Sequence, residues 1–161
     1  MLAVAAVIAV FVVIELLSGS SSDSGSRPQA PPLPPTALTG KPVTLADLRG
    51  EPALVNFWAS WCGPCRKEAP ELQRFSHTLH GNARLVGVDF TDDAGSARAF
   101  ARQAGWSYPL LRDPNGTYGD RYHLNGLPAT AVLDAKGRIV ALLKGPQSVD
   151  TLQAALAGAR S

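Results

Sequence analysis

"NFWASWCGPCRKEAP", residues 56–70, holds both cysteines of this 161-residue chain. The apolar, β-prone residues 53–59 lead into the cysteines and predict a buried strand. Apolar residues at helical spacing follow them and predict a helix over 63–80, which Pro70 kinks but does not end. The sequence therefore places a pair of cysteines between a strand and a helix.

The spacing of the cysteines favours redox chemistry. Cys62 lies at the expected N-terminus of the helix, where free backbone N–H groups and the helix dipole stabilise a thiolate. Cys65 lies one turn further in and is less accessible. Gly63 and Pro64 allow a tight first turn, since proline needs no N–H there. We expect Cys62 to attack a disulfide and Cys65 to resolve the mixed disulfide that forms.

Two other uses of the cysteines fit less well. Structural zinc needs four ligands, and the three histidines, at positions 77, 80 and 123, are not at ligand spacing. A purely structural disulfide between residues so close in sequence would constrain little of the unfolded chain. We therefore expect a redox pair, with no metal and no cofactor.

The N-terminus predicts a location outside the cytoplasm. Residues 2–14 are thirteen consecutive apolar residues, fewer than the roughly 20 that a spanning helix needs. This length suits the core of a signal peptide, and we expect 1–17 to be a signal peptide or an uncleaved membrane anchor. Residues 18–35, rich in Ser, Gly and Pro, are typical of a linker. The folded domain is then expected at 36–161.

The rest of the chain alternates between strand and helix patterns, which predicts an α/β fold with helices on both faces of a sheet. Hydrophobic residues make up 45% of the chain, which is enough for a core. The net charge is +2 and the basic residues are scattered, which argues against a nucleic-acid partner. The expected elements are strands at 83–90, 108–113, 130–134 and 138–143, the last two joined as a hairpin, and helices at 94–105 and, with Ser148 as N-cap, 148–159.

The pattern W-C-x-P-C-x-x-E-x-P, from Trp61 to Pro70, resembles that of the TlpA/ResA/CcmG-like group of membrane-tethered, extracytoplasmic thioredoxin-fold proteins. The resemblance implies a thioredoxin fold, with a central mixed β-sheet flanked by helices. Residues 94–111 resemble the helix–strand element that this group inserts. Residues 41–59 resemble its N-terminal hairpin and first central strand.

The resemblance also implies roles for residues away from the cysteines. Pro128 in GLPAT matches a cis-proline that lies against the cysteine pair, and the backbone of Leu127 would pair with a substrate strand. Trp61 would form a rim that shields the sulfurs, while we expect Trp58 to be a core residue. The expected substrate-binding residues are Trp61, Gly63, Pro64, Leu127 and Pro128.

Asn56 stands where plain thioredoxin has a buried aspartate, and an amide cannot exchange a proton at neutral pH. The resemblance implies that an acidic residue after the next strand replaces it, and the alignment places this residue at Asp92. The catalytic residues expected are then Cys62, Cys65 and Asp92. Alternatively, Asp92 or Asp93 only caps the following helix.

The resemblance implies an enzyme, a protein-disulfide reductase of exported proteins, with apocytochrome c as one substrate. A membrane dithiol would supply the electrons, and the N-terminus would tether the protein to the membrane unless it is cleaved and the protein secreted. One alternative is a general disulfide reductase or oxidase. Another is a copper carrier, although such proteins usually have a longer cysteine spacing. A peroxidase is disfavoured because Ala59 stands where a peroxiredoxin has threonine.

Overall fold

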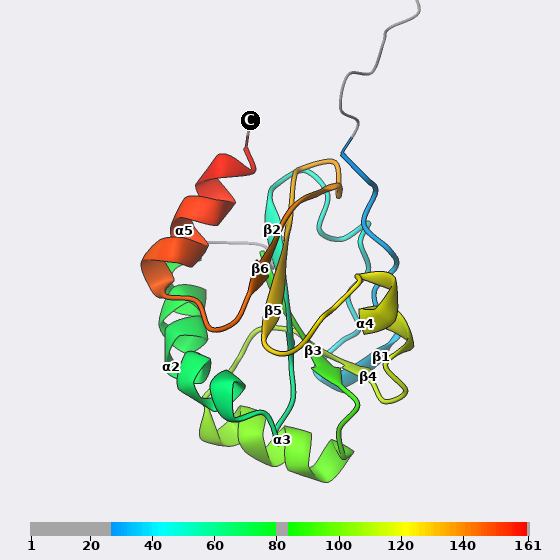
Figure 1. Cartoon of the computed structure of the whole chain (residues 1–161), viewed down its shortest axis with the longest axis vertical. Coiled ribbons are helices and arrows are strands. Elements are labelled where there is room, and N and C mark those ends of the chain that lie inside the picture. Colours follow the sequence, from blue (N-terminus) through cyan, green and yellow to red (C-terminus); the bar gives the residue numbers. More distant parts are fainter. Residues whose placement is uncertain (1–26, 80–83, 161) are drawn as a thin grey trace, which may run out of the picture.

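A single six-stranded sheet forms the centre of the molecule, in the order β1-β4-β3-β2-β5-β6 (Figure 1). The computed structural model of the chain describes residues 27–79 and 84–160. The strands are β1 (Thr36–Thr39), β2 (Ala53–Trp58), β3 (Leu85–Phe90), β4 (Leu110–Asp113), β5 (Ala129–Leu133) and β6 (Ile139–Lys144). The helices are α2 (Gly63–Thr78), α3 (Ala94–Gln103), α4 (Thr117–Arg121) and α5 (Val149–Gly158).

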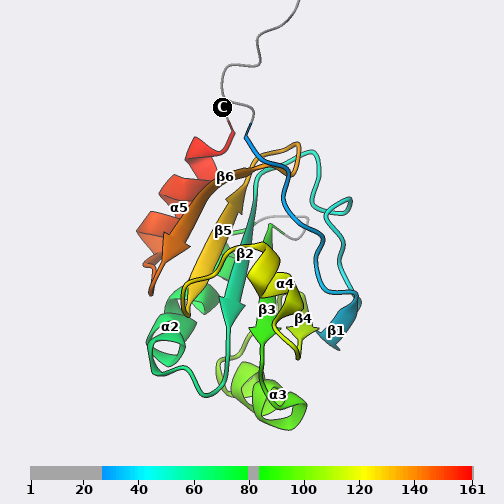
Figure 2. The same ribbon diagram turned by 45° about the vertical axis from the view of Figure 1, so that its right-hand side comes forward.

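The pairing of the strands is that of the expected mixed sheet. The central strand β2 is parallel to β3 and antiparallel to β5, β3 is parallel to β4, and β5 and β6 form the expected hairpin. Figure 2 shows the strands side by side with α2 and α5 over one face. The element α3–β4 adds a parallel strand beside β3, as the resemblance implied for residues 94–111. The expected α/β fold, a central mixed sheet flanked by helices, is confirmed.

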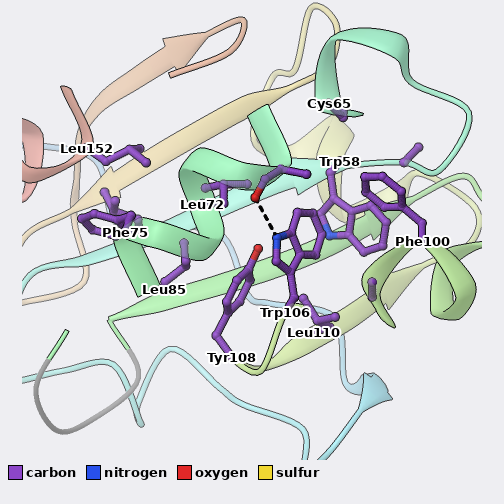
Figure 3. Close-up of a cluster of buried hydrophobic side chains, with 14 of the residues drawn as sticks. Trp58, Cys65, Leu72, Phe75, Leu85, Phe100, Trp106, Tyr108, Leu110 and Leu152 are labelled. Atoms are coloured by element: carbon purple, nitrogen blue, oxygen red, sulfur yellow. Dashed lines mark hydrogen bonds between the residues drawn. The ribbon is translucent and has the colours of Figure 1, made fainter. Parts of the chain in front are cut away.

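Alternation along β2 divides the core into two layers, because successive side chains point to opposite faces. Leu54 and Trp58 face α2, α3 and α5, whereas Val55 and Phe57 face α4 and the N-terminal segment. In the first layer, the rings of Trp58, Phe100 and Trp106 pack together with centroids 4.8–5.3 Å apart (Figure 3). Trp58 is completely buried, so the expectation that it belongs to the core is confirmed.

The folded domain begins before the expected boundary at residue 36. Ala30 and Leu33, both placed in the linker by the sequence, are buried in the second core layer. The hydroxyl of Tyr122 donates to the carbonyl of Pro31 at 2.7 Å, and the backbone of Pro28 accepts from Ile139 of β6 at 2.8 Å. The proline-rich sequence of this segment suggested a free spacer. In the structure, its extended backbone lies along the domain and its few apolar side chains are buried.

The hairpin expected within 41–59 does not form. The first strand, β1, pairs antiparallel with the distant β4 instead, with Thr36 opposite Arg112. Residues 41–52 form turns, in which the carboxylate of Asp47 accepts hydrogen bonds from the backbone N–H and the hydroxyl of Thr44, at 2.8 and 2.7 Å. This local side-chain pairing competes with a strand, and it lets Leu48 turn into the second core layer.

The helices follow the sequence signals closely. Helix α2 continues through Pro70 to Thr78, and Ser148 caps α5 by accepting from the N–H of Thr151 at 3.2 Å. Within the described ranges, no helix has the length and apolar character needed to cross a membrane. The apolar run at 2–14, on which the expected signal or anchor depends, lies outside the described residues.

Candidate active site

Cys62 and Cys65 form a disulfide at the start of α2, with their Cα atoms 5.2 Å apart. Cys62 is the N-cap residue, and its sulfur accepts a hydrogen bond from the backbone N–H of Cys65 at 3.1 Å. The same N–H would stabilise a thiolate on Cys62 in the reduced protein. Cys62 is 4% exposed and Cys65 is 1% exposed, so an incoming disulfide reaches Cys62 first.

Four of the five expected substrate-binding residues line one hollow together with Cys62: Trp61, Gly63, Pro64 and Leu127. The Leu127–Pro128 peptide bond is cis, as the resemblance implied. Leu127 and Pro128 both border a smaller hollow of about 200 Å³, on the side facing β6. Trp61 is 59% exposed and forms one wall of the larger hollow beside the sulfur. This larger hollow, which we call the substrate hollow, measures about 350 Å³ and is lined by Trp61, Cys62, Gly63, Pro64, Phe90, Leu124, Gly126 and Leu127.

A polar pair lies buried under α2, one helical turn after Cys65. The amide Nδ2 of Asn56 donates to a carboxylate oxygen of Glu68 at 3.1 Å and to the hydroxyl of Thr130 at 2.9 Å. The second carboxylate oxygen of Glu68 accepts from the backbone N–H of Gln147 at 2.9 Å. Asn56, which cannot exchange a proton, therefore contacts a side chain that can.

Burial raises the pKa of Glu68 from 4.5 to about 7, and the hydrogen bonds from Gln147 and Asn56 only partly offset this. The Glu68 carboxyl therefore gains and loses its proton near neutral pH. Glu68 is the glutamate of the motif at 61–70, and the motif alone implied no role for it. Its position was the available signal, because a residue three after Cys65 lies on the same, buried side of the helix.

In the structure, Asp92 contacts Ser60, which lies two residues before Cys62 in the sequence. Its carboxylate accepts from the backbone N–H of Ser60 at 2.5 Å and from the Ser60 hydroxyl at 3.0 Å. Asp93 is the N-cap of α3 and accepts from the N–H of Ser96 at 2.8 Å. The capping role thus belongs to Asp93, while proton transfer by Asp92 stays a prediction.

Another carboxyl, that of Asp89, lies fully buried at the end of β3, a position to which the sequence analysis gave no role. Its oxygen Oδ2 pairs with Nε of Arg112 on β4 at 3.4 Å. Burial, together with the nearby charge of Asp92, raises the pKa of Asp89 to about 7, and Arg112 opposes that rise. Two buried carboxyls, Glu68 on α2 and Asp89 on β3, therefore have pKa values near neutrality.

With this geometry in view, comparison with known proteins identifies the family. Residues 27–142 match the AhpC/TSA family. The chain belongs to that family. It is 37% identical over 134 residues to the thiol:disulfide interchange protein HelX of Rhodobacter capsulatus, which covers 73% of this chain and 74% of HelX. It is 29% identical over 107 residues to the thiol-disulfide oxidoreductase ResA of Bacillus subtilis, which covers 66% of this chain and 60% of ResA.

Solved structures give the same result. A secreted disulfide oxidoreductase of Mycobacterium tuberculosis, described as homologous to DsbE of E. coli, superposes with a TM-score of 0.67 at 28% identity, over 76% of this chain and 92% of that one. The expected family and the enzyme class, a thiol–disulfide oxidoreductase, are confirmed. The chain spans 58% to 74% of the length of four curated relatives that it matches.

Proposed function

We propose that this protein is an extracytoplasmic reductant of disulfides in exported proteins, with apocytochrome c among its substrates. The observation that carries the proposal is the cysteine pair at the start of α2, with Cys62 opening onto an apolar hollow beside Leu127. The apolar run at 2–14 and the secreted relative support a location outside the cytoplasm. The same run would tether the protein to the membrane, where a dithiol would return electrons to it.

The reaction follows from the placement of the two sulfurs. The Cys62 thiolate attacks one sulfur of the substrate disulfide, forming a mixed disulfide and releasing the other substrate sulfur as a thiolate. Cys65 then loses its proton and attacks Cys62, which releases the second substrate thiolate. The substrate takes up two electrons and two protons, and the protein is left with the Cys62–Cys65 disulfide seen in the structure.

We assign the transfer of the Cys65 proton to Glu68 rather than to Asp92. Glu68 lies one turn after Cys65 on the same helix and has a pKa of about 7, so it accepts and returns a proton near neutral pH. The carboxylate of Asp92, the proton carrier that the resemblance implied, contacts Ser60, which precedes Cys62 in the chain. Asn56 orients the Glu68 carboxyl by donating to it.

The walls of the substrate hollow indicate the kind of segment it accepts. Phe90, Leu124 and Leu127 supply apolar surface, and the ring of Trp61 stands at the rim. We expect an extended peptide to lie along Leu127, with an apolar side chain next to its cysteine in the hollow. A disulfide in an unfolded exported chain, such as the cysteine pair that later binds haem, presents this arrangement.

A resolving-cysteine variant tests the proposal directly. Without Cys65, a mixed disulfide at Cys62 persists, because no second thiol attacks it. Full-length Cys65→Ser protein, expressed with its own N-terminus, should capture apocytochrome c or a haem-ligation component, and Cys62→Ser/Cys65→Ser protein should capture nothing. A strain lacking Cys62 should lose c-type haem. Normal haem attachment in that strain, with unrelated exported proteins in the trap, would leave only the general reductase.

The other activities considered are measurable on the same preparation. Ala59 stands where a peroxiredoxin has threonine, which predicts that hydrogen peroxide is not turned over. A copper carrier would bind Cu(I) through the reduced cysteine pair. Tight, stoichiometric copper binding combined with no disulfide reduction would favour the carrier over the reductant.

A further inference from the structure

The turn after β3 contacts both residues that precede Cys62. The carboxylate of Asp92 accepts from the N–H of Ser60 at 2.5 Å and from its hydroxyl at 3.0 Å. The carbonyl of Thr91 accepts from the indole Nε1 of Trp61 at 3.2 Å. Three hydrogen bonds therefore connect this turn to the two residues just before Cys62.

The neighbouring strand, β4, holds this turn in place. The Arg112 guanidinium donates from Nη2 to the carbonyl of Asp92 at 2.9 Å, and the carbonyl of Asp113 accepts from the N–H of Thr91, also at 2.9 Å. Thr91 has a φ of +49°, a backbone conformation that a β-branched residue rarely adopts. Such a conformation persists when the surrounding contacts enforce it, and the contacts here come from β4.

Arg112 itself is held by a buried carboxyl, that of Asp89. Its Nε faces Oδ2 of Asp89, its cross-strand neighbour, at 3.4 Å, and the Arg112 side chain is 20% exposed. The planar guanidinium thus contacts a carboxylate with one nitrogen and the turn carbonyl with another. A lysine would keep the charge but would offer a single nitrogen in place of this fork.

We infer that Arg112 is a positioning residue for substrate recognition: through the turn at Thr91–Asp93 it fixes the indole of Trp61 as a wall of the substrate hollow. Arg112 touches neither cysteine. Trp61 is the exposed large apolar side chain of the described residues, and the hydrogen bond to Thr91 is the one that orients its ring. The inference rests on the proposed function only in taking the hollow to receive substrate.

The test separates recognition from thiol chemistry. Full-length protein in detergent is reduced and mixed, in single turnover, with a disulfide-bonded Cys-x-x-Cys-His peptide or with the small disulfide dithiobis(nitrobenzoate). In Arg112→Gln protein, the peptide concentration that gives half the maximal rate should rise about tenfold, the effect of losing one charge-assisted hydrogen bond. The maximal rate and the rate with the small disulfide should stay within about twofold of wild type.

Two further variants distinguish positioning from damage to the fold. Arg112→Lys should fall between wild type and Arg112→Gln. Arg98→Gln is the matched control, because Arg98 also donates to a backbone carbonyl, from Nε to Leu38 of β1 at 3.2 Å. It should bind peptide like wild type.

A second readout is the time-resolved fluorescence anisotropy of Trp61, since Trp58 and Trp106 are buried. Arg112→Gln should add a fast component, which Trp61→Phe in the same background removes.

Three results would overturn the inference. One is an unchanged peptide dependence and unchanged anisotropy in Arg112→Gln. Another is an equal loss of rate with both disulfides, which would make Arg112 part of the general structure of the site. The third is an Arg98→Gln effect as large as that of Arg112→Gln. If the wild-type protein fails to reduce the peptide at all, the proposed function fails, and the anisotropy still decides whether Arg112 holds Trp61.

Discussion

Glu68 shows how a single buried charge couples folding to the redox site. The side chain is 1% exposed, and its carboxyl is held by Asn56 and Gln147 from two other elements. An ionised carboxylate in such a place is costly, which is why its pKa is near 7. A negative charge there also disfavours a thiolate on the neighbouring cysteine pair, which makes the pair a better electron donor.

Glu68 predicts that the oxidised protein loses stability as the pH rises. Its pKa is raised from 4.5 to about 7 on folding, so the folded chain holds the proton more tightly than the unfolded chain between these values. A tenfold change in proton affinity corresponds to about 1.4 kcal/mol, so ionising Glu68 costs about 3 kcal/mol at most. Urea unfolding should show the free energy of unfolding falling from pH 5 to pH 7.5.

Asp89 has a raised pKa as well and contributes a slope of the same sign. Glu68→Gln should therefore reduce the slope by about half rather than abolish it. Redox measurements on the same variant should show slower resolution of the mixed disulfide at neutral pH. A wild-type slope retained in full by Glu68→Gln would show that Glu68 is not the titrating group.

Cys62 should be the reactive thiol of the reduced protein. It caps α2, accepts the N–H of Cys65 and borders the substrate hollow, whereas Cys65 is buried behind it. Alkylation with iodoacetamide across pH should modify Cys62 first, with a pKa below the value of about 8.5 for a free thiol. Cys65→Ser protein should keep this profile. The assignment would be reversed if Cys65 in the Cys62→Ser protein were labelled faster than Cys62 in the Cys65→Ser protein.

At the scale of elements, the sequence correctly predicted those strands and helix ends that neighbouring residues determine. Residues 53–59 are an apolar run bounded by polar residues, and β2 forms there; Ser148 caps α5 as its position before the helix indicated. The hairpin expected within 41–59 does not form because Thr44 and Asp47 pair locally in a turn. The pairing of β1 with the distant β4 was not predicted, because no local pattern encodes it. The contacts of Glu68 could not be predicted locally either, since Asn56, Thr130 and Gln147 come together only in the fold.

Asp92 and Asp93 are adjacent, yet the structure predicts different consequences for their replacement. Asp93→Ala removes the N-cap of α3, so the urea midpoint of unfolding should fall while peptide reduction is unchanged. Asp92→Asn keeps the shape but weakens the hydrogen bonds from Ser60, so peptide recognition should weaken with a smaller change in stability. The reverse pattern, with recognition lost in Asp93→Ala alone, would contradict the contacts described.

At the scale of the whole molecule, the segment at 27–35 belongs to the domain rather than to a spacer. A chain that begins at Thr36 loses the buried Ala30 and Leu33 and leaves the Tyr122 hydroxyl without its acceptor, Pro31. Burial of a leucine alone is worth about 2 kcal/mol. The shortened chain should therefore be less stable to urea than a chain beginning at Arg27 by at least that amount. Equal urea midpoints for the two chains would show that residues 27–35 are part of the linker.

The reduction potential of the cysteine pair tests the central claim, that this oxidoreductase donates electrons. Gly63 and Pro64 between the cysteines add no positive charge, and the carboxyl of Glu68 lies under the pair, so the thiolate receives little help beyond the start of α2. Full-length protein equilibrated with dithiothreitol or glutathione buffers should have a potential near the thioredoxin value of about −270 mV. A potential near the value of about −120 mV, typical of a disulfide donor, would contradict the account.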